Sequence, residues 1–127
     1  LFPTQRHYTM MQSLLLVGAG GAAGSMLRFL LQKYLNTNFP YGTLLVNFLG
    51  CLLIGILLGM ITKNHLNEQG RLILVTGFCG GFTTFSAFTA EANQMMMEQK
   101  PVLFFAYLLI SVAIGLAATF VGFKLFH

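Results

Sequence analysis

The sequence contains very few charged residues, and this scarcity is its most informative feature. Asp, Glu, Lys and Arg make up 8% of the 127 residues, whereas a soluble domain contains roughly 25%. The composition is 56% hydrophobic, with a mean hydropathy of +0.75. A soluble fold is therefore excluded, and the composition predicts an integral membrane protein with a single domain, residues 1–127.

Cysteine, histidine and clustered charge are also lacking, and each absence excludes a class of site. Cys51 and Cys79 lie in apolar runs without a CxxC spacing, so they cannot form the disulfide framework of a small secreted protein. The three histidines show no ligand spacing such as HExxH, which argues against a transition-metal site. Ser86 has no nearby His and no buried base, so we expect no enzyme activity. The seven Lys and Arg residues form no basic patch, so we expect no nucleic-acid partner.

Four apolar runs are long enough to cross a bilayer as helices, which takes about 20 residues. They cover residues 13–34, 41–62, 68–98 and 101–123. The links between them are short, so consecutive helices must be antiparallel. The residues before Met10 include Arg6 but no clear cleavage site, so we do not expect a cleaved signal peptide.

Positive charges are divided almost evenly between the two sides of the predicted membrane. One side holds Arg6, Lys63, Arg71 and Lys124, and the other holds Arg28, Lys33 and Lys100. An excess of Lys and Arg on one side normally sets the orientation of a membrane protein. The balance predicts insertion in both orientations, and the alternative is one orientation fixed by another signal.

The third span contains a stretch that is unfavourable for a helix. Gly80 and Gly81 each cost about 1 kcal/mol relative to Ala, and Thr83 and Thr84 are β-branched. A membrane span can lose helical hydrogen bonds only where protein or a polar cavity replaces them. We therefore predict a helix broken at residues 79–83, with carbonyl oxygens from Gly80 to Thr83 aimed at an ion. The alternative is a flexible kink packed by phenylalanine side chains.

The residues after the break are expected to line the path of a solute. Thr84, Phe85, Phe88 and Glu91 lie close to one helix face, and Ser86 is next to them. A phenylalanine ring has a positive edge, so rings presented edge-on can attract an anion without a fixed charge. Three roles stay open for Glu91: it relays protons, gates the mouth of the path, or pairs with a lysine.

Rows of small residues lie four positions apart in two of the spans. Gly20 and Gly24 form such a row in the first span, and Cys51, Gly55 and Gly59 form one in the second. Small residues let membrane helices approach closely, so the rows predict packing faces. Four such helices can barely enclose a pathway by themselves, so we expect an oligomer.

Polar side chains within the spans are costly and therefore suggest function. Asn47 offers two amide donors and serves either a functional role or helix–helix contact. Arg28 either attracts anions or extends to the lipid headgroups. The hydroxyls of the fourth span either line a path or bond to their own preceding turn. They belong to a face at four-residue spacing that consists of Tyr107, Ser111, Gly115 and Thr119.

Three segments make this sequence resemble the Fluc fluoride-channel family, also called CrcB. They are GGAAGSMLR at residues 20–28, GTLLVN at 42–47 and TGFCGGFTTFSAF at 76–88. The last segment is long and specific, and the resemblance covers all four spans. The sequence departs from the family pattern at Ala87, where a hydroxyl residue is frequent, and at Gly115, where a related chain can have Ser.

The resemblance implies an all-α membrane protein of the bacterial inner membrane. Two chains inserted in opposite orientations would form an antiparallel homodimer with two fluoride pores along the interface. A central sodium ion would be held by the backbone carbonyls of Gly80 and Thr83. The implied fluoride path contains Arg28, Asn47, Thr84, Phe85, Ser86, Phe88, Ser111 and Thr119, with Tyr107 beside it and Glu91 at one end. The resulting hypothesis is a passive fluoride exporter.

Two other functions are compatible with four short spans. A small proton-coupled multidrug exporter needs a membrane-embedded carboxylate, usually in the first span, and here the candidate is Glu91 in the third. An assembly subunit without transport would show no ion-dependent behaviour.

Overall fold

The computed structural model describes residues 7–126, and all its regular elements are helices. They are α1 (Met10–Leu35), α2 (Tyr41–Thr62), α3 (Glu68–Gly70), η1 (Arg71–Cys79), α4 (Gly80–Phe82), α5 (Phe85–Met97) and α6 (Pro101–Leu125). Four stretches are long and apolar enough to cross a membrane: Met10–Leu35, Tyr41–Thr62, Glu68–Met97 and Pro101–Leu125. The prediction of four spans is therefore confirmed. Arg6, which entered the charge count, lies outside the described residues.

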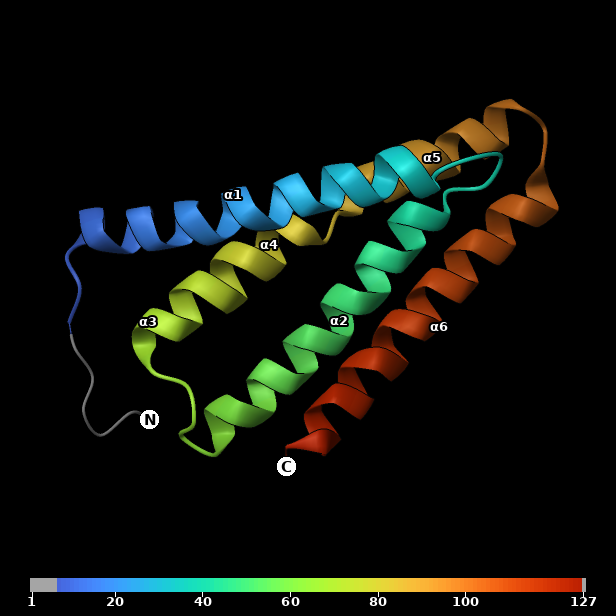
Figure 1. Ribbon diagram of the computed structural model, residues 1–127. Coiled ribbons are helices and arrows are strands. Elements are labelled where there is room, and N and C mark those ends of the chain that lie inside the picture. The colour runs from blue at the N-terminus through green and yellow to red at the C-terminus, as the bar shows by residue number, and fades with distance from the viewer. Residues whose placement is uncertain (1–6, 127) are drawn as a thin grey trace.

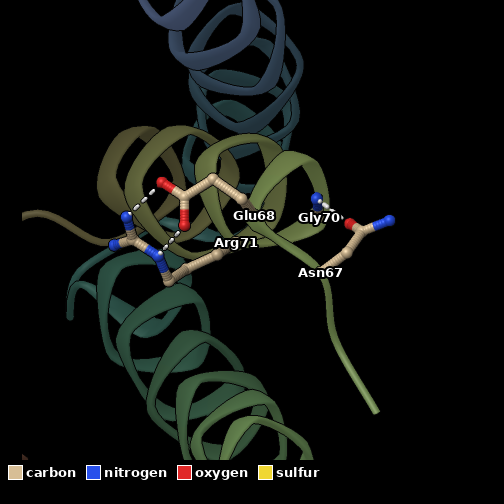
Figure 2. A network of polar contacts seen from close by, with 4 residues as sticks. All are labelled: Asn67, Glu68, Gly70 and Arg71. Atoms are coloured by element: carbon tan, nitrogen blue, oxygen red, sulfur yellow. Dashed lines mark hydrogen bonds and ion pairs between the residues drawn. The ribbon is translucent and has the colours of Figure 1, made fainter. Parts of the chain in front are cut away.

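Polar side-chain caps mark the start of the first and third spans. Thr9 and Gln12 form a capping box, in which each side chain accepts a hydrogen bond from the other's backbone N–H, so α1 begins at Met10 and not at residue 13. Asn67 accepts a bond from the Gly70 N–H at 2.7 Å and caps the third span (Figure 2). At the same point Glu68 and Arg71 form a two-bond ion pair at 2.6 and 3.1 Å.

The four spans form two closely packed pairs, as Figure 1 shows: α1 lies along the third span, and α2 lies beside α6. In the first pair, a Cβ on Gly20 or Gly24 would collide with a backbone carbonyl oxygen of η1. In the second pair, a Cβ on Gly55 or Gly122 would collide with a carbonyl oxygen of the partner helix. The rows of small residues therefore act as packing faces, as predicted.

The third span is divided into four parts, and the predicted break is present at Thr83 and Thr84, at the C-terminal edge of the predicted residues 79–83. Arg71–Cys79 forms a π-helix, which the sequence did not predict. Gly80 and Gly81 remain helical, and the extended residues are Thr83 and Thr84, so the placement of the break at the paired glycines was wrong. Gly81 serves a different purpose, because a Cβ there would collide with the carbonyl oxygen of Gly21 on α1. Gly81 thus allows close helix contact, while the threonines interrupt the helix.

Candidate functional site

Two threonines create the interruption between α4 and α5. Thr83 ends α4 because its backbone is extended, with a ψ of 155°. Its backbone N–H and its hydroxyl still donate to the Cys79 carbonyl, at 3.0 and 2.9 Å. Thr84 begins α5 because its hydroxyl oxygen accepts a bond from the Ala87 N–H at 3.1 Å. Side-chain oxygens therefore replace part of the helical hydrogen bonding that the break removes, as a membrane interior requires.

Asn47 on α2 satisfies both backbone groups of Thr84, the second residue of the break. Its Oδ1 accepts a hydrogen bond from the Thr84 N–H at 2.8 Å, and its Nδ2 donates to the Thr84 carbonyl at 3.1 Å. The side chain therefore joins two helices and fixes the break at the same time. Its second amide N–H has no hydrogen-bond partner within residues 7–126 and is available to a solute.

The carbonyl oxygens at the end of α4 lose the N–H groups that a continuous helix would provide, and Gly80 and Thr83 are two of them. The helical partner of Gly80 would be Thr84, and that of Thr83 would be Ala87. The Thr84 N–H instead donates to Asn47, and the Ala87 N–H donates to the Thr84 hydroxyl. Carbonyl oxygens of this kind suit a hard cation. Within the described part of the chain, no group of three or more His, Cys, Asp or Glu side chains is gathered for a metal.

The Arg28 side chain is directed into the protein toward the break. Its Nε donates to the Gly81 carbonyl at 3.0 Å, and its Nη1 donates to the Gln32 Oε1 at 3.2 Å. The guanidinium is therefore not extended to the headgroups in this conformation. It places a positive charge at the last turn of α4, where carbonyl dipoles make the helix end negative.

A chain of hydrogen bonds continues from Arg28 to Glu91 in the middle of α5. The Gln32 Nε2 donates to the Thr43 hydroxyl oxygen at 3.0 Å, and the Thr43 hydroxyl donates to Glu91 Oε2 at 2.6 Å. Thr43 is fully buried. Asn36 also donates to Glu91 Oε2, at 3.0 Å. Gln32, Asn36 and Thr43 were not predicted as site residues from the sequence. A row at four-residue spacing, Arg28, Gln32 and Asn36, is the signal that could have identified the first two.

Glu91 is a shared acceptor for three of the four spans. It receives bonds from Asn36 at the end of α1, from Thr43 on α2 and from the Tyr107 hydroxyl on α6 at 2.9 Å. None of the lysines in the described part of the chain is its partner, so the alternative of a lysine pair is wrong. A carboxylate that accepts three hydrogen bonds in a partly buried position ties the helices together at this end.

The two phenylalanines after the break face different environments. Phe85 is 75% exposed, whereas Phe88 is 7% exposed, so they do not share one buried face. Their ring centroids are still 5.8 Å apart, and Phe88 lies 5.0 Å from the Tyr107 ring. Tyr107 in turn reaches Glu91. Rings and polar groups therefore run without a gap from the break to Glu91.

The predicted hydroxyls differ in their hydrogen-bond partners. Thr84 and Ser86 lie 3.3 Å apart beside the break. The Ser111 hydroxyl is buried without a hydrogen-bond partner among the described residues, so its proton is free to form a hydrogen bond. Thr119 donates to the Cys51 carbonyl on α2 at 3.2 Å and serves helix contact. Neither fourth-span hydroxyl bonds to its own preceding turn, which was the alternative for this face.

The structure therefore brings most of the predicted residues into one connected region. Near the break it gathers Arg28, Asn47, Gly80, Thr83, Thr84, Phe85 and Ser86, and beside the first two turns of α5 it gathers Phe88, Glu91 and Tyr107. Hydroxyls, amide donors and ring edges can replace water around a small ion, but they offer no activated nucleophile. The fold and this region define a multi-pass helical membrane protein with a broken third span.

Comparison with known proteins places the chain more closely. Residues 15–123 match the family model described as "CrcB-like protein, Camphor Resistance (CrcB)", and the chain belongs to this family. A fluoride-specific ion channel FluC of Phocaeicola vulgatus is 44% identical over 116 residues, which are 88% of this chain and 96% of that protein. Proteins with the same name from Flavobacterium psychrophilum and Gloeothece citriformis are 41% and 42% identical, each over 88% of this chain and 94% of their own length.

Proposed function

We propose that this chain is a fluoride-selective ion channel that lets cytoplasmic fluoride leave a bacterial cell passively across the inner membrane. One observation carries the proposal. Asn47 holds the break in the third span open beside Phe85 and Ser86, in a chain whose relatives are named as fluoride-specific channels. A channel, rather than an enzyme, fits a region that contains donors and ring edges but no reactive pair.

Fluoride is small and strongly hydrated, so a pore must replace much of its water shell with donors. The free N–H of Asn47 and the hydroxyls of Thr84 and Ser86 supply donors near the break. The edges of the Phe85 and Phe88 rings supply partial positive charge without a fixed cation. Several weak sites in sequence allow the ion to bind and then to leave.

The remaining residues extend the proposed path in both directions. Arg28 supplies positive potential at the break, and Ser111 supplies a buried hydroxyl with an uncommitted proton. Tyr107 and Glu91 mark the other end, and Thr119 contributes mainly to the contact between α6 and α2. The narrow, largely apolar path would disfavour the larger chloride ion.

The proposed channel is an antiparallel homodimer with two pores along the interface. A single chain leaves Phe85 largely exposed and Gly80 open on its outer side, with no atom near a Cβ built there. The nearly equal division of Lys and Arg between the two sides supports insertion in both orientations. A second copy covering the break would complete the wall of each pore.

A sodium ion at the centre of this dimer fits the donors that the break provides. Gly80 and Thr83 would hold it through carbonyl oxygens that have lost their helical N–H partners. Carbonyl oxygens replace the hydration shell of a hard cation at broken membrane helices. The ion would supply a structural link and positive potential, while the conducting residues stay those of the chain.

Fluoride efflux from proteoliposomes, followed with a fluoride electrode, tests the proposed function. We expect fluoride efflux and no comparable chloride efflux. The double variant Phe85→Ala and Phe88→Ala should lose most of the flux, whereas Phe105→Ala, a 58% exposed ring on α6, is the matched control. Equal rates for chloride and fluoride would contradict the proposal.

The sodium site has a separate test in the same vesicles. Replacing sodium on both sides with a bulky organic cation should reduce fluoride efflux, because the carbonyls of Gly80 and Thr83 cannot enclose the larger ion. Unchanged efflux after exhaustive removal of sodium would contradict the sodium site and leave the fluoride channel standing.

A further inference from the structure

A small polar cavity lies where the two short connections on one side of the bundle meet. Residues 36–40 join α1 to α2, residues 98–100 join α5 to α6, and both connections lie at the same end of the molecule (Figure 1). The cavity has a volume of about 240 Å³. Its polar lining includes Asn36, Asn38, Glu91, Gln94, Glu98 and Lys100.

The inner wall of this cavity is the polar end of the region described above. Asn36 and Glu91 line the cavity and are hydrogen-bonded to each other at 3.0 Å. Glu91 accepts from Tyr107, whose ring contacts Phe88, which contacts Phe85. Water that fills the cavity therefore reaches the first group of the continuous row that leads to the break.

The charges around the cavity are unfavourable for an anion except at one position. Among its lining residues, Glu91 and Glu98 are acidic and Lys100 is basic. The Lys100 ammonium lies 3.1 Å from Glu98 Oε2, and the Gln94 amide donates to Glu98 Oε1 at 2.8 Å. The Gln94 bond, and after it Lys100, lower the pKa of Glu98, so this carboxylate is charged at neutral pH.

The connection that carries the ion pair is well defined. The Lys100 N–H donates to the Met95 carbonyl at 2.9 Å, and the Gln99 N–H donates to the Met96 carbonyl at 3.0 Å. Gln99 has a positive φ of 59°, which turns the chain sharply at the end of α5. Both charged side chains are about half exposed, at 51% and 44%, so the pair contributes little to stability and can be changed without unfolding the protein.

We propose that this cavity is the aqueous mouth of the anion path and that the Glu98–Lys100 pair sets the local concentration of halide in it. The inference rests on the proposed fluoride channel. Lys100 attracts the anion, and Glu98 offsets that attraction. Changing either charge alters the rate at which an anion enters, while the chemistry of the narrow part of the path stays the same.

Conductance in planar bilayers at low fluoride tests the proposal. At an ionic strength of about 10 mM, the Debye length is about 30 Å and one charge at the mouth is poorly screened. Lys100→Gln should then lower fluoride conductance about two- to fourfold, and Glu98→Gln should raise it by a similar factor. At about 1 M inert salt, where screening acts within about 3 Å, both differences should disappear.

Lys33→Gln is the matched control, because Lys33 is an exposed lysine near the same end of the bundle that does not line the cavity. An equal loss in Lys33→Gln would assign the effect to general surface potential and overturn the proposal. Wild-type conductance in both Lys100→Gln and Glu98→Gln at low ionic strength would also overturn it. The absence of fluoride current in the unmodified protein would instead contradict the proposed function.

Discussion

At the scale of single residues, Asn47 shows how one side chain makes a broken membrane helix tolerable. It is the partner of both backbone groups of Thr84. Asn47→Ala would leave a backbone donor and a backbone acceptor unpaired, at about 1–3 kcal/mol for each group. We expect a loss of about 2–6 kcal/mol in the free energy of unfolding, together with a large loss of fluoride efflux. Unfolding in detergent and proteoliposome flux measure the two effects.

The control for this change is Asn93→Ala. Asn93 is an exposed asparagine on α5 whose amide donates only to the Met97 sulfur, at 3.4 Å. Its removal should change stability by less than about 0.5 kcal/mol and leave flux unchanged. If Asn47→Ala is as stable as Asn93→Ala, the two hydrogen bonds do not hold the break.

Glu91 and Tyr107 form a second group whose members depend on one another. Tyr107→Phe removes one hydrogen bond and should cost about 1 kcal/mol. Glu91→Leu removes the acceptor for three donors and should cost about 3 kcal/mol or more, because those donors stay partly buried without a partner. Thermal unfolding in detergent measures both losses of stability, and we expect the larger loss in Glu91→Leu.

A double-mutant cycle checks that the two residues act through each other. Adding Tyr107→Phe to Glu91→Leu should cost much less than Tyr107→Phe does alone, because the phenol has already lost its acceptor. Additive effects of the two changes would mean that the hydrogen bond between them contributes nothing to stability.

At the scale of helices, glycine position decides whether two spans can touch. Gly24 on α1 faces the Phe78 carbonyl so closely that a Cβ would collide with it, whereas a Cβ on Gly18 has no atom within 4 Å. Gly24→Ala must push α1 away from the third span and should cost about 1–3 kcal/mol. Gly18→Ala is the control and should be neutral or stabilising by up to about 1 kcal/mol.

The same pair of variants has a functional consequence that unfolding alone does not show. Arg28 lies one helical turn beyond Gly24 and reaches the Gly81 carbonyl at 3.0 Å. Moving α1 outward should break this bond, so Gly24→Ala should reduce fluoride efflux in the folded protein and Gly18→Ala should not. Equal efflux for both variants would mean that α1 does not position the break.

The spans and their packing faces could be predicted from the sequence because hydropathy and small-residue spacing are local signals. The second span, Tyr41–Thr62, matches its predicted range, and Gly20 and Gly24 pack as expected. The position of the break depends instead on tertiary contacts. Two adjacent glycines are the local signal for a break, but at Gly81 the glycine lets α1 pack closely against the helix. The break lies instead at Thr84, whose backbone N–H donates to Asn47 of another span.

The polar network was missed for a related physical reason. Gln32 and Thr43 are unremarkable in the sequence, and they become important because the fold brings them to Arg28 and Glu91. The π-helix Arg71–Cys79 likewise has no local composition that predicts it. Helix propensity therefore identified the unusual third span. The hydrogen-bond partners of its unpaired groups depend on the tertiary structure and could not be predicted from the sequence.

At the scale of the whole molecule, the even distribution of positive charge has a direct consequence. If the channel needs two chains of opposite orientation, a variant forced into one orientation should be inactive alone. His65→Arg with Gln69→Arg adds charge on the side of the chain ends, at two exposed positions. Tyr34→Arg with Val102→Arg adds charge on the other side, at positions that are 71% and 82% exposed. The side with more Lys and Arg stays in the cytoplasm.

We expect each orientation-biased variant to give little fluoride efflux alone and the two variants to give near wild-type efflux when they are expressed together. The reason is that only the mixture contains chains of both orientations, so only the mixture can place two breaks back to back. Labelling of an engineered cysteine from one side of the membrane verifies the orientation of each variant. Full activity of one fully oriented variant alone would show that a parallel or single-chain arrangement conducts, and the antiparallel dimer would be wrong.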